Sequence, residues 1–371
     1  MTAVYELQCF GSNGSGQLGV GHEEDLMLPI TSFVSKGIGI KKVTCGGNHS
    51  LLLLEDGSLF WCGDNSVGQC APIGKENADT PNKSCSWVSV PGKYIDVACG
   101  WEFSVVIDSE GMVMTRGKGC KGELGVPEVT ESDVWNALFR VQDRRNATCH
   151  AAFQHCAVVD RNVVFAWGNN RKQQICGESS LKVVDSPREI YHGRGSSEYV
   201  RVAVGKDFTF ILVDKEGKQD LILQGPLQQE LPRIISKLDA DQTTVKQFAS
   251  MWSSLHLLTE SGHLISIGRG SHGQFLQNPI PSNTIGFAAG SEHGILITSG
   301  MEVYCWGWGE HGNCGPLRPQ GSSLESENHV TAHHVNDKSN VISPLNLIGK
   351  YENVEAVYGG CATTWIVARS D

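Results

Sequence analysis

The sequence predicts an all-β, seven-bladed β-propeller, because two different motifs each recur seven times. The first is a glycine that ends an apolar run, found at Gly11, Gly63, Gly117, Gly168, Gly225, Gly268 and Gly307. Successive copies are 39 to 57 residues apart, a period typical of propellers and solenoids. The second is a short turn, such as Cys45–Ser50, that precedes a strand in each repeat. Because both motifs give the same count, we predict seven blades.

Each repeat reads as a strand, a hairpin and a returning strand. In Val43–Gly63, the Asp56-Gly57 pair between two apolar runs is a strong hairpin signal. Because the chain reverses at the hairpin, the turn before the first strand and the loop after the second should emerge on one side of the disc. We call this side the turn face and the opposite side the hairpin face.

The two ends of the sequence complement each other. Residues 3–11 (AVYELQCFG) lead into the first glycine motif, and residues 363–368 (TTWIVA) follow the last turn. Each alone would leave a sheet edge unpaired, so we expect the two strands to pair and close the ring. We therefore predict one domain over residues 1–371, with a mobile loop at 317–340, where the sequence is polar.

Composition excludes several classes of protein. The net charge of −10 argues against direct binding of nucleic acid, which needs a basic surface. No apolar stretch is long enough to span a membrane, and we see no signal peptide. The thirteen cysteines lie mostly in apolar runs and never form a CxxC pair, so we expect reduced thiols in the cytoplasm or nucleus. We also expect this chain to build no metal site of its own.

The glycine-rich loops do not predict a catalytic or nucleotide site. GSNGSGQLG lacks the Lys-Ser/Thr pair of a phosphate loop, and the same spacing recurs in every repeat, as a structural motif would. No Ser-His-Asp or Cys-His arrangement stands out from the repeats. We therefore expect a protein that is not an enzyme, with no catalytic residues and no cofactor.

Candidate binding residues lie where the turns differ from one another. The turn frame persists, yet two neighbouring positions diverge and carry the partner-binding candidates Trp101, Glu102, Lys206, Asp207, Trp252 and Glu292. Exposed rings beside polar groups suit a protein interface, although rings that pack between blades remain an alternative. His49 and His293 exchange with Phe103 and Phe208 at the next turn position, so we expect them in the core.

A further set of candidates lies in VYCWGWGEHGNCGP, residues 303–316. Trp308, Glu310 and His311 stand where the first repeat has small residues, which favours a role in partner binding. His329, His333 and His334 fall within the predicted mobile loop, where solvated side chains are a better interpretation than metal ligands.

The motifs CGGNHS and GSNGSGQLG, with an apolar-Asp-Gly-apolar hairpin between them, resemble the regulator-of-chromosome-condensation repeat. The resemblance covers essentially the whole chain, although two copies are degraded. The peptides FGSNGSGQLGVGHEED, VYCWGWGEHGNCGP and GGCATTWIV further resemble a fungal subfamily. This implies a non-catalytic propeller that pairs with a small zinc- or iron-binding protein of diphthamide synthesis. The pair would serve Elongator-dependent modification of the tRNA wobble uridine and diphthamide formation on elongation factor two.

One other function remains open for such a propeller, and a further one is disfavoured. A guanine-nucleotide exchange factor would be expected to carry a wedge inserted in a blade, for which Val126–Asn146 is the candidate segment. The first residues carry no basic tail of the kind expected in that class. A platform for ubiquitin ligation would need a second domain, and the propeller uses the whole sequence.

Overall fold

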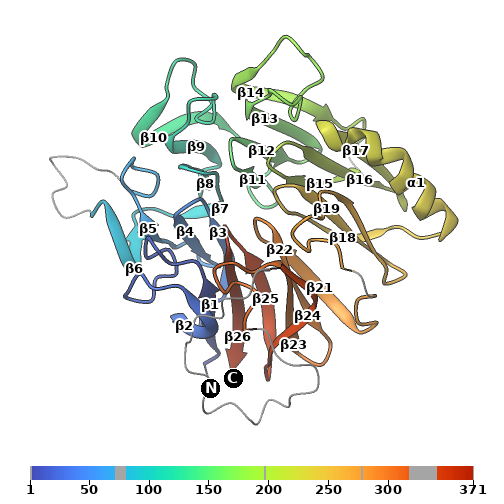
Figure 1. Cartoon of the computed structure of the whole chain (residues 1–371). Coiled ribbons are helices and arrows are strands. Elements are labelled where there is room, and N and C mark those ends of the chain that lie inside the picture. Colours follow the sequence, from blue (N-terminus) through green and yellow to red (C-terminus); the bar gives the residue numbers. More distant parts are fainter. Residues whose placement is uncertain (1, 72–80, 196–197, 277–278, 317–340, 371) are drawn as a thin grey trace.

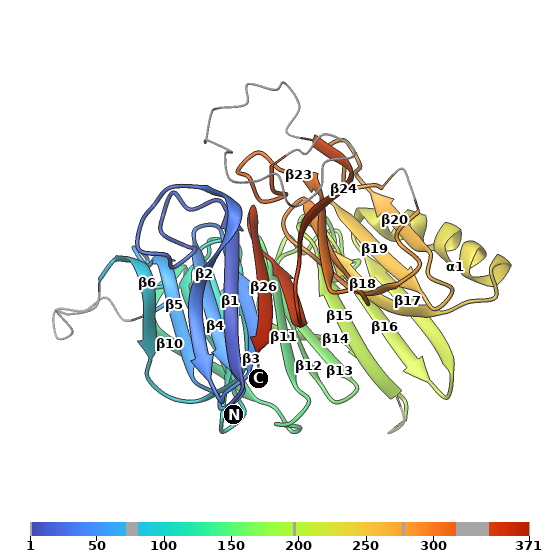
Figure 2. The ribbon, with the colours of Figure 1, turned by 90° about the horizontal axis from the view of Figure 1, so that it is seen from below.

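Seven β-sheets surround a central axis in the computed structural model, which describes residues 2–71, 81–195, 198–276, 279–316 and 341–370 (Figures 1 and 2). The predicted seven-bladed all-β propeller is therefore confirmed. The loop predicted at 317–340, with its three histidines, lies outside the described residues.

Blades one, two, three and six have four antiparallel strands, numbered from the axis outwards. Blade one contains β3 (Ile40–Cys45), β4 (His49–Leu54), β5 (Leu59–Asp64) and β6 (Lys83–Val90). Blade two contains β7 (Tyr94–Cys99), β8 (Phe103–Asp108), β9 (Met112–Lys118) and β10 (Glu131–Arg140). Blade three contains β11 (Thr148–Ala152), β12 (His155–Asp160), β13 (Val163–Asn169) and β14 (Val183–His192). Blade six contains β21 (Thr284–Ala289), β22 (His293–Thr298), β23 (Glu302–Trp308) and β24 (Val341–Lys350).

Within the described residues, blades four and five have three strands each. Blade four contains β15 (Glu198–Val204), β16 (Thr209–Lys215) and β17 (Lys218–Gln224), and blade five contains β18 (Val245–Ser250), β19 (Ser254–Thr259) and β20 (Leu264–Gly268). After β17 the chain forms the 3-10 helix η1 (Pro226–Glu230) and the helix α1 (Leu231–Ala240). Ile234 and Leu238 of α1 are buried in the core shared by these two blades, so the helix covers apolar surface where a fourth strand would otherwise lie.

Blade seven joins the two ends of the chain. It contains β25 (Val354–Gly359), β26 (Thr363–Ser370), β1 (Val4–Gly11) and β2 (Leu26–Lys36). The pairing of β1 with β26 is uninterrupted from Val4–Ser370 to Gly11–Thr363, and the N and C ends lie side by side (Figure 1). The predicted latch of the ring is thus confirmed.

The seven motif glycines are required by backbone geometry. All have a positive φ, between 93° and 112°, which other residues rarely adopt. A Cβ at any of them would lie 2.3 to 2.6 Å from a carbonyl oxygen of the turn in the same blade. The next residue usually donates its N–H to that carbonyl, as Asp64 does to Asn48 at 2.8 Å. Turn and loop therefore share one face, as predicted, except that Pro226 has no N–H to donate.

Three turn histidines connect neighbouring blades in the core. The Nε2 atoms of His49, His155 and His293 lie 3.1, 3.1 and 2.9 Å from hydroxyl groups of Ser104, Thr209 and Thr364 in the next blade. All three rings are fully buried. Burial lowers the pKa of His49 and His293 to about 4 and that of His155 to about 3. The core role expected for His49 and His293 agrees with this arrangement.

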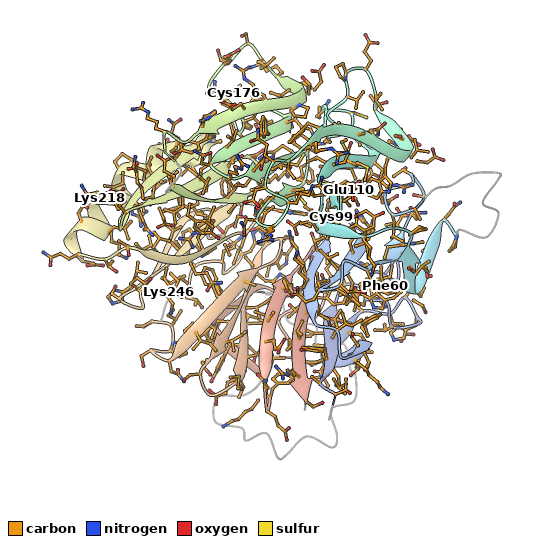
Figure 3. All side chains as sticks on the ribbon, turned by 180° about the vertical axis from the view of Figure 1, so that it is seen from behind. Phe60, Cys99, Glu110, Cys176, Lys218 and Lys246 are labelled. Carbon is orange, nitrogen blue, oxygen red and sulfur yellow. The ribbon has the colours of Figure 1, made fainter. Side chains whose placement is uncertain are left out.

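The thirteen cysteines are all unpaired, and most are buried. Cys99 lies on an inner strand near the centre of the disc, whereas Cys176 lies towards its rim (Figure 3). Within the described ranges, no helix has the length and apolar character needed to cross a bilayer.

Candidate protein-binding face

Three aromatic rings meet at the centre of the turn face. Trp101, Phe153 and Trp252 follow the inner strands of blades two, three and five. Their ring centroids are 5.4, 5.6 and 5.7 Å apart in the three pairings, with the planes tilted by about 60°. Each side chain is half-buried, so part of every ring faces solvent. The two predicted tryptophans are thus brought together, and Phe153 completes an aromatic triad.

Lys206 adds a positive charge to the triad. Its Nζ lies 4.4 Å from the centroid of the Phe153 ring, a cation–π distance. Glu102 and Asp207 occupy the next position in the turns of blades two and four, and both are half-buried. The face therefore combines aromatic surface with both signs of charge near the axis.

Backbone hydrogen bonds link successive turns around the axis. The N–H groups of Gly47 and Trp101 donate to Trp101 and Phe153 at 2.9 and 2.8 Å. A second series runs from Lys206 to Trp252, Ser291 and Gly360, at 2.8, 2.7 and 2.9 Å. Among the described residues, no such bond joins Phe153 to Lys206 or the turn of blade seven to Gly47. The turns therefore form two arcs.

Direct alignment of YGGCAT (residues 358–363) with CGGNHS (residues 45–50) places Gly360 and Cys361 at the two variable turn positions, and the structure shows this register to be wrong by one residue. Gly360 donates to Thr363 as Gly46 donates to His49, so Gly360 corresponds to the first turn glycine. Cys361 and Ala362 hold the two variable positions of that turn, in place of Gly360 and Cys361.

A cavity of about 510 Å³ lies along the axis beside the triad. Much of its wall is small side chains of the inner strands and turns, including Ala98, Ala152, Ala249 and Ala289. A second cavity opens on the hairpin face and shares His150, Val202 and Phe248 with the first. The shared lining indicates an axial channel whose turn-face end is bordered by the aromatic triad.

Glu292 was predicted to bind a partner, but its carboxylate already makes hydrogen bonds within the propeller. Its Oε2 accepts hydrogen bonds from Ser253 Oγ and Gln274 Nε2, both at 2.7 Å. These donors belong to blade five, whereas Glu292 belongs to blade six. The carboxylate is therefore engaged in holding two blades together.

Trp308, the last residue of β23, forms a separate group with Glu310 and His311 of the loop that follows. Trp308 stacks on His272, with centroids 4.4 Å apart and planes 20° apart. His311 Nδ1 lies 2.9 Å from an Asp25 carboxylate oxygen, and Glu310 is exposed. Trp308 N–H donates to the Glu292 carbonyl, so this group adjoins the central turns.

Sequence reasoning gave too little weight to two residues. Phe153 holds the same turn position as Trp101, and that equivalence was the available signal. His272 had no comparable signal, because its contact with Trp308 arises only when loops of different blades meet. In the part of the chain that the structure describes, no group of three His, Cys, Asp or Glu residues is placed to hold a metal ion.

The segment Val126–Asn146 is part of a regular blade. Its centre is β10, the fourth strand of blade two, which pairs with β9. The hypothesis that it forms an inserted wedge is therefore wrong for the strand residues, which complete the sheet.

These features define the class of protein as a seven-bladed propeller made from one repeated sequence unit. Models of the regulator of chromosome condensation (RCC1) repeat match residues 7–53, 56–107 and 40–69. An RCC1 repeat-containing protein of Schizosaccharomyces pombe is 31% identical over 324 residues, covering 83% of this chain and 88% of that protein. The chain belongs to the RCC1-repeat family.

Two further comparisons extend this likeness. A secretion-regulating guanine nucleotide exchange factor of Bos taurus is 26% identical over 355 residues, covering 83% of this chain and 75% of that protein. The crystal structure of Prp20p from Saccharomyces cerevisiae has a TM-score of 0.68 at 16% identity, covering 99% of this chain and 92% of that one. The second likeness concerns the fold alone.

Proposed function

We propose that the chain is a non-catalytic scaffold that binds one small protein through its turn face. The partner would be the small zinc- or iron-binding protein of diphthamide synthesis, in a heterodimer found in cytoplasm and nucleus. The pair would support Elongator-dependent modification of the tRNA wobble uridine and diphthamide formation on elongation factor two. Any contact with Elongator would be indirect.

The aromatic triad carries this proposal. Large rings that are half-buried and surrounded by polar side chains are the usual anchors of protein interfaces. Trp101, Phe153 and Trp252 present one such surface at the centre of a face. The loop of Trp308 and Glu310 extends that surface towards blade six.

The choice of partner rests on sequence resemblance. The peptides at 10–25, 303–316 and 359–367 resemble the fungal alpha-tubulin suppressor, also called a killer-toxin-insensitivity protein. Membership of the RCC1-repeat family is consistent with that subfamily and does not distinguish it from others.

Calorimetric titration with the small metal-binding diphthamide protein of the same organism tests the proposal. We expect a one-to-one complex with the unaltered chain. Trp252→Ala and Trp101→Ala should each weaken binding by more than about 1 kcal/mol, because a truncated anchor loses its buried contact. Lys206→Ala should weaken it less, since its charge is partly solvated.

Tyr199→Ala is the matched control, because this ring is 62% exposed and belongs to the hairpin face. It should leave the affinity unchanged. Melting curves would confirm that each variant folds, and Trp252→Phe should recover most of the affinity. Normal binding by folded variants of both tryptophans would reject the turn face as the interface.

Guanine-nucleotide exchange on a small GTPase is the second candidate function. It is supported by the similarity of the chain to the secretion-regulating guanine nucleotide exchange factor of Bos taurus, at 26% identity. Absence of a complex with the diphthamide protein, together with accelerated nucleotide release from a small GTPase, would favour this function over the scaffold.

A further inference from the structure

A sizeable cavity lies on the hairpin face, between blades three and four. Its volume is about 1050 Å³, and its wall includes the exposed ring of Tyr199 together with Val159 and Phe248. Arg201 reaches across to Phe248 with its guanidinium 5.4 Å from the ring centroid. The cavity therefore has an aromatic and aliphatic floor near its opening into the axial channel.

Both acidic residues at the mouth of this cavity are engaged by their own surroundings. Glu198 accepts hydrogen bonds from Tyr191 Oη, Lys215 Nζ and the Arg194 N–H. Asp143 accepts from the side chain and the N–H of Asn146. The hydrogen bond from Tyr191 lowers the pKa of Glu198, and that from Asn146 lowers the pKa of Asp143. Both therefore stay ionised with their oxygens occupied.

Two arginines at the same mouth make no hydrogen bond of this kind, although the charge of Arg161 also helps to lower the pKa of Asp143. Arg161 and Arg194 are exposed, and among the described residues neither guanidinium has a hydrogen bond or an ion pair. Arg161 also has φ of 57°, a backbone conformation that costs energy for a residue with a side chain. The side-chain amide of Asn162 holds the backbone on both sides of Arg194, because it donates to the carbonyls of Gly193 and Gly195 at 3.1 and 3.2 Å.

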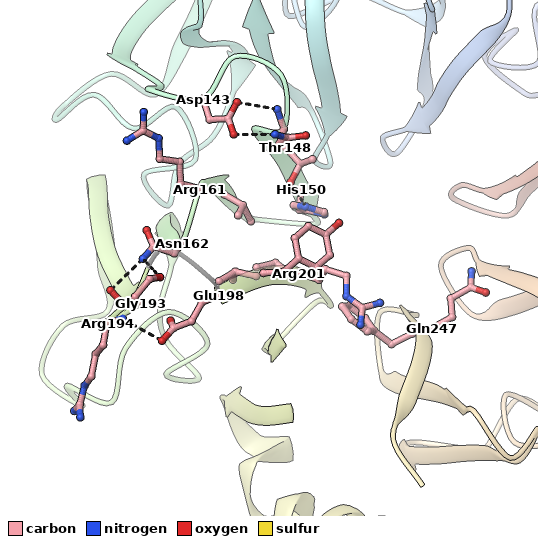
Figure 4. Close-up of a pocket in the computed structure, with 17 residues that line it drawn as sticks. Asp143, Thr148, His150, Arg161, Asn162, Gly193, Arg194, Glu198, Arg201 and Gln247 are labelled. Carbon is pink, nitrogen blue, oxygen red and sulfur yellow. Dashed lines mark hydrogen bonds between the residues drawn. The ribbon is translucent and has the colours of Figure 1, made fainter. Parts of the chain in front are cut away.

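The arrangement of these groups favours an extended ligand over a single anion. The Arg161 and Arg194 side chains point away from each other on either side of Asn162 (Figure 4). Two separated guanidinium groups suit carboxylates spaced along a chain, and the Tyr199 and Phe248 rings between blades suit apolar side chains of that chain. A compact phosphate would need donors that converge on one point.

We propose that this cavity, here named the arginine mouth (Arg161, Arg194, Tyr199 and the floor around Phe248), is a second docking site that takes an extended acidic segment of a protein. It is independent of the turn face, so one propeller would hold two partners on opposite sides. Charge complementarity supports this occupant, because the mouth presents two exposed guanidinium groups without a hydrogen-bonded partner among the described residues, on a chain whose net charge is −10.

Fluorescence anisotropy with a labelled glutamate-rich peptide tests the proposal, using the full chain at low salt. We expect saturable binding that falls as salt increases. The double variant R161A/R194A should weaken it by about tenfold or more, and Tyr199→Ala should also weaken it. The control Arg171→Ala removes an exposed arginine from a turn-face loop and should change nothing.

Three outcomes would overturn the proposal. They are no binding of the glutamate peptide, equal binding of the same peptide with glutamines, or unchanged binding by a folded R161A/R194A variant. Tighter binding of a single-stranded oligonucleotide than of the peptide would reject the acidic segment as occupant. The variants W101A and W252A should bind the peptide normally, so failure of the turn-face proposal would be recognised separately.

Discussion

At the scale of the residue, the contact between neighbouring blades follows a simple pairing. Where a turn carries histidine, the next blade offers a hydroxyl, as in the pairs His49–Ser104 and His155–Thr209. Where the turn carries Phe103 or Phe208, the corresponding residue of the next blade is Cys156 or Leu255. A polar turn residue thus meets a polar residue of the next blade, and an apolar turn residue meets an apolar one. This matching explains why His and Phe can replace each other at this turn position.

The matched pairs predict the effect of exchanging one kind for the other. His155→Phe should lower the free energy of unfolding by about 1–3 kcal/mol, because the buried Thr209 hydroxyl loses its partner. The double variant H155F/T209V should recover much of this loss, since it imitates the apolar pair Phe208–Leu255. Denaturant unfolding at pH 7.5 measures both values.

The pH dependence of the free energy of unfolding provides a second test of the same variants. The pKa of His155 is about 3 in the folded chain and near its ordinary value of 6.5 when unfolded. Between about pH 3 and pH 6.5 the unfolded state binds more protons at His155 than the folded state does. The contribution of His155 to the free energy of unfolding is therefore fully present above about pH 6.5 and is lost as the pH falls. The loss from one such group is about 1.4 kcal/mol per pH unit. H155F/T209V should lose less stability between pH 6.5 and pH 5 than the unaltered chain. An equal loss would show that His155 does not contribute.

At the scale of the element, a buried glutamine side chain holds the backbone of most turn-face loops that follow a motif glycine. Gln17, Gln69, Gln174 and Gln274 are buried in four of these loops, and each Oε1 accepts a backbone N–H two residues earlier. The loop of blade two instead has Glu123, which accepts from the Lys121 N–H. Burial raises the pKa of Glu123, because the charged form loses hydration.

Glu123→Gln should therefore stabilise the protein. The raised pKa means that the folded state holds its proton at pH values where the unfolded state has lost it, so the carboxyl destabilises the fold above its ordinary pKa. We expect a gain of up to about 1 kcal/mol at pH 7 and almost none near pH 4. Thermal melting at both pH values measures this. The reverse change Gln69→Glu is the control and should destabilise at pH 7; a stabilising Gln69→Glu would contradict the explanation.

Inner and middle elements were predictable from sequence, whereas outer ones were not. The β4 and β19 strands are buried throughout and read as short apolar runs between turn signals. The outer strand β10 repeats one exposed and two half-buried residues instead of the two-residue alternation of a regular strand, and register shifts interrupt its pairing with β9. Helix α1 replaces a strand after Gly225-Pro226, where the repeat is weakest. Trp101 and Trp252 could be selected because they depart from the repeat, but their contact with Phe153 depends on the curvature of the whole ring.

At the scale of the whole molecule, stability depends on the latch between β1 and β26. Leu7 of β1 is fully buried in a cluster that also contains Trp365 of β26 and Val43 of blade one. It therefore packs where the closing blade meets its neighbour. No disulfide joins the described residues at this junction, so closure of the ring depends on the strand pairing and packing of the latch.

Leu7→Ala should lower the free energy of unfolding by about 2–5 kcal/mol through the cavity it creates. Hydrogen exchange should also accelerate in β1 and β26 more than in the other blades, because the latch opens before the ring unfolds. Leu212→Ala, at an equally buried site in blade four, is the control and should not single out the latch. A loss below about 1 kcal/mol for Leu7→Ala would mean that the latch contributes little.

The turn hydrogen bonds form two arcs, which leaves two places around the axis, here called joints, where no such bond links neighbouring turns among the described residues. One joint lies where Lys206 covers Phe153, directly between the blades that border the arginine mouth. Trp101 belongs to one arc and Trp252 to the other. A partner that contacts both tryptophans would therefore bridge the two arcs on the turn face, above the place where His155 and Thr209 link the same two blades in the core.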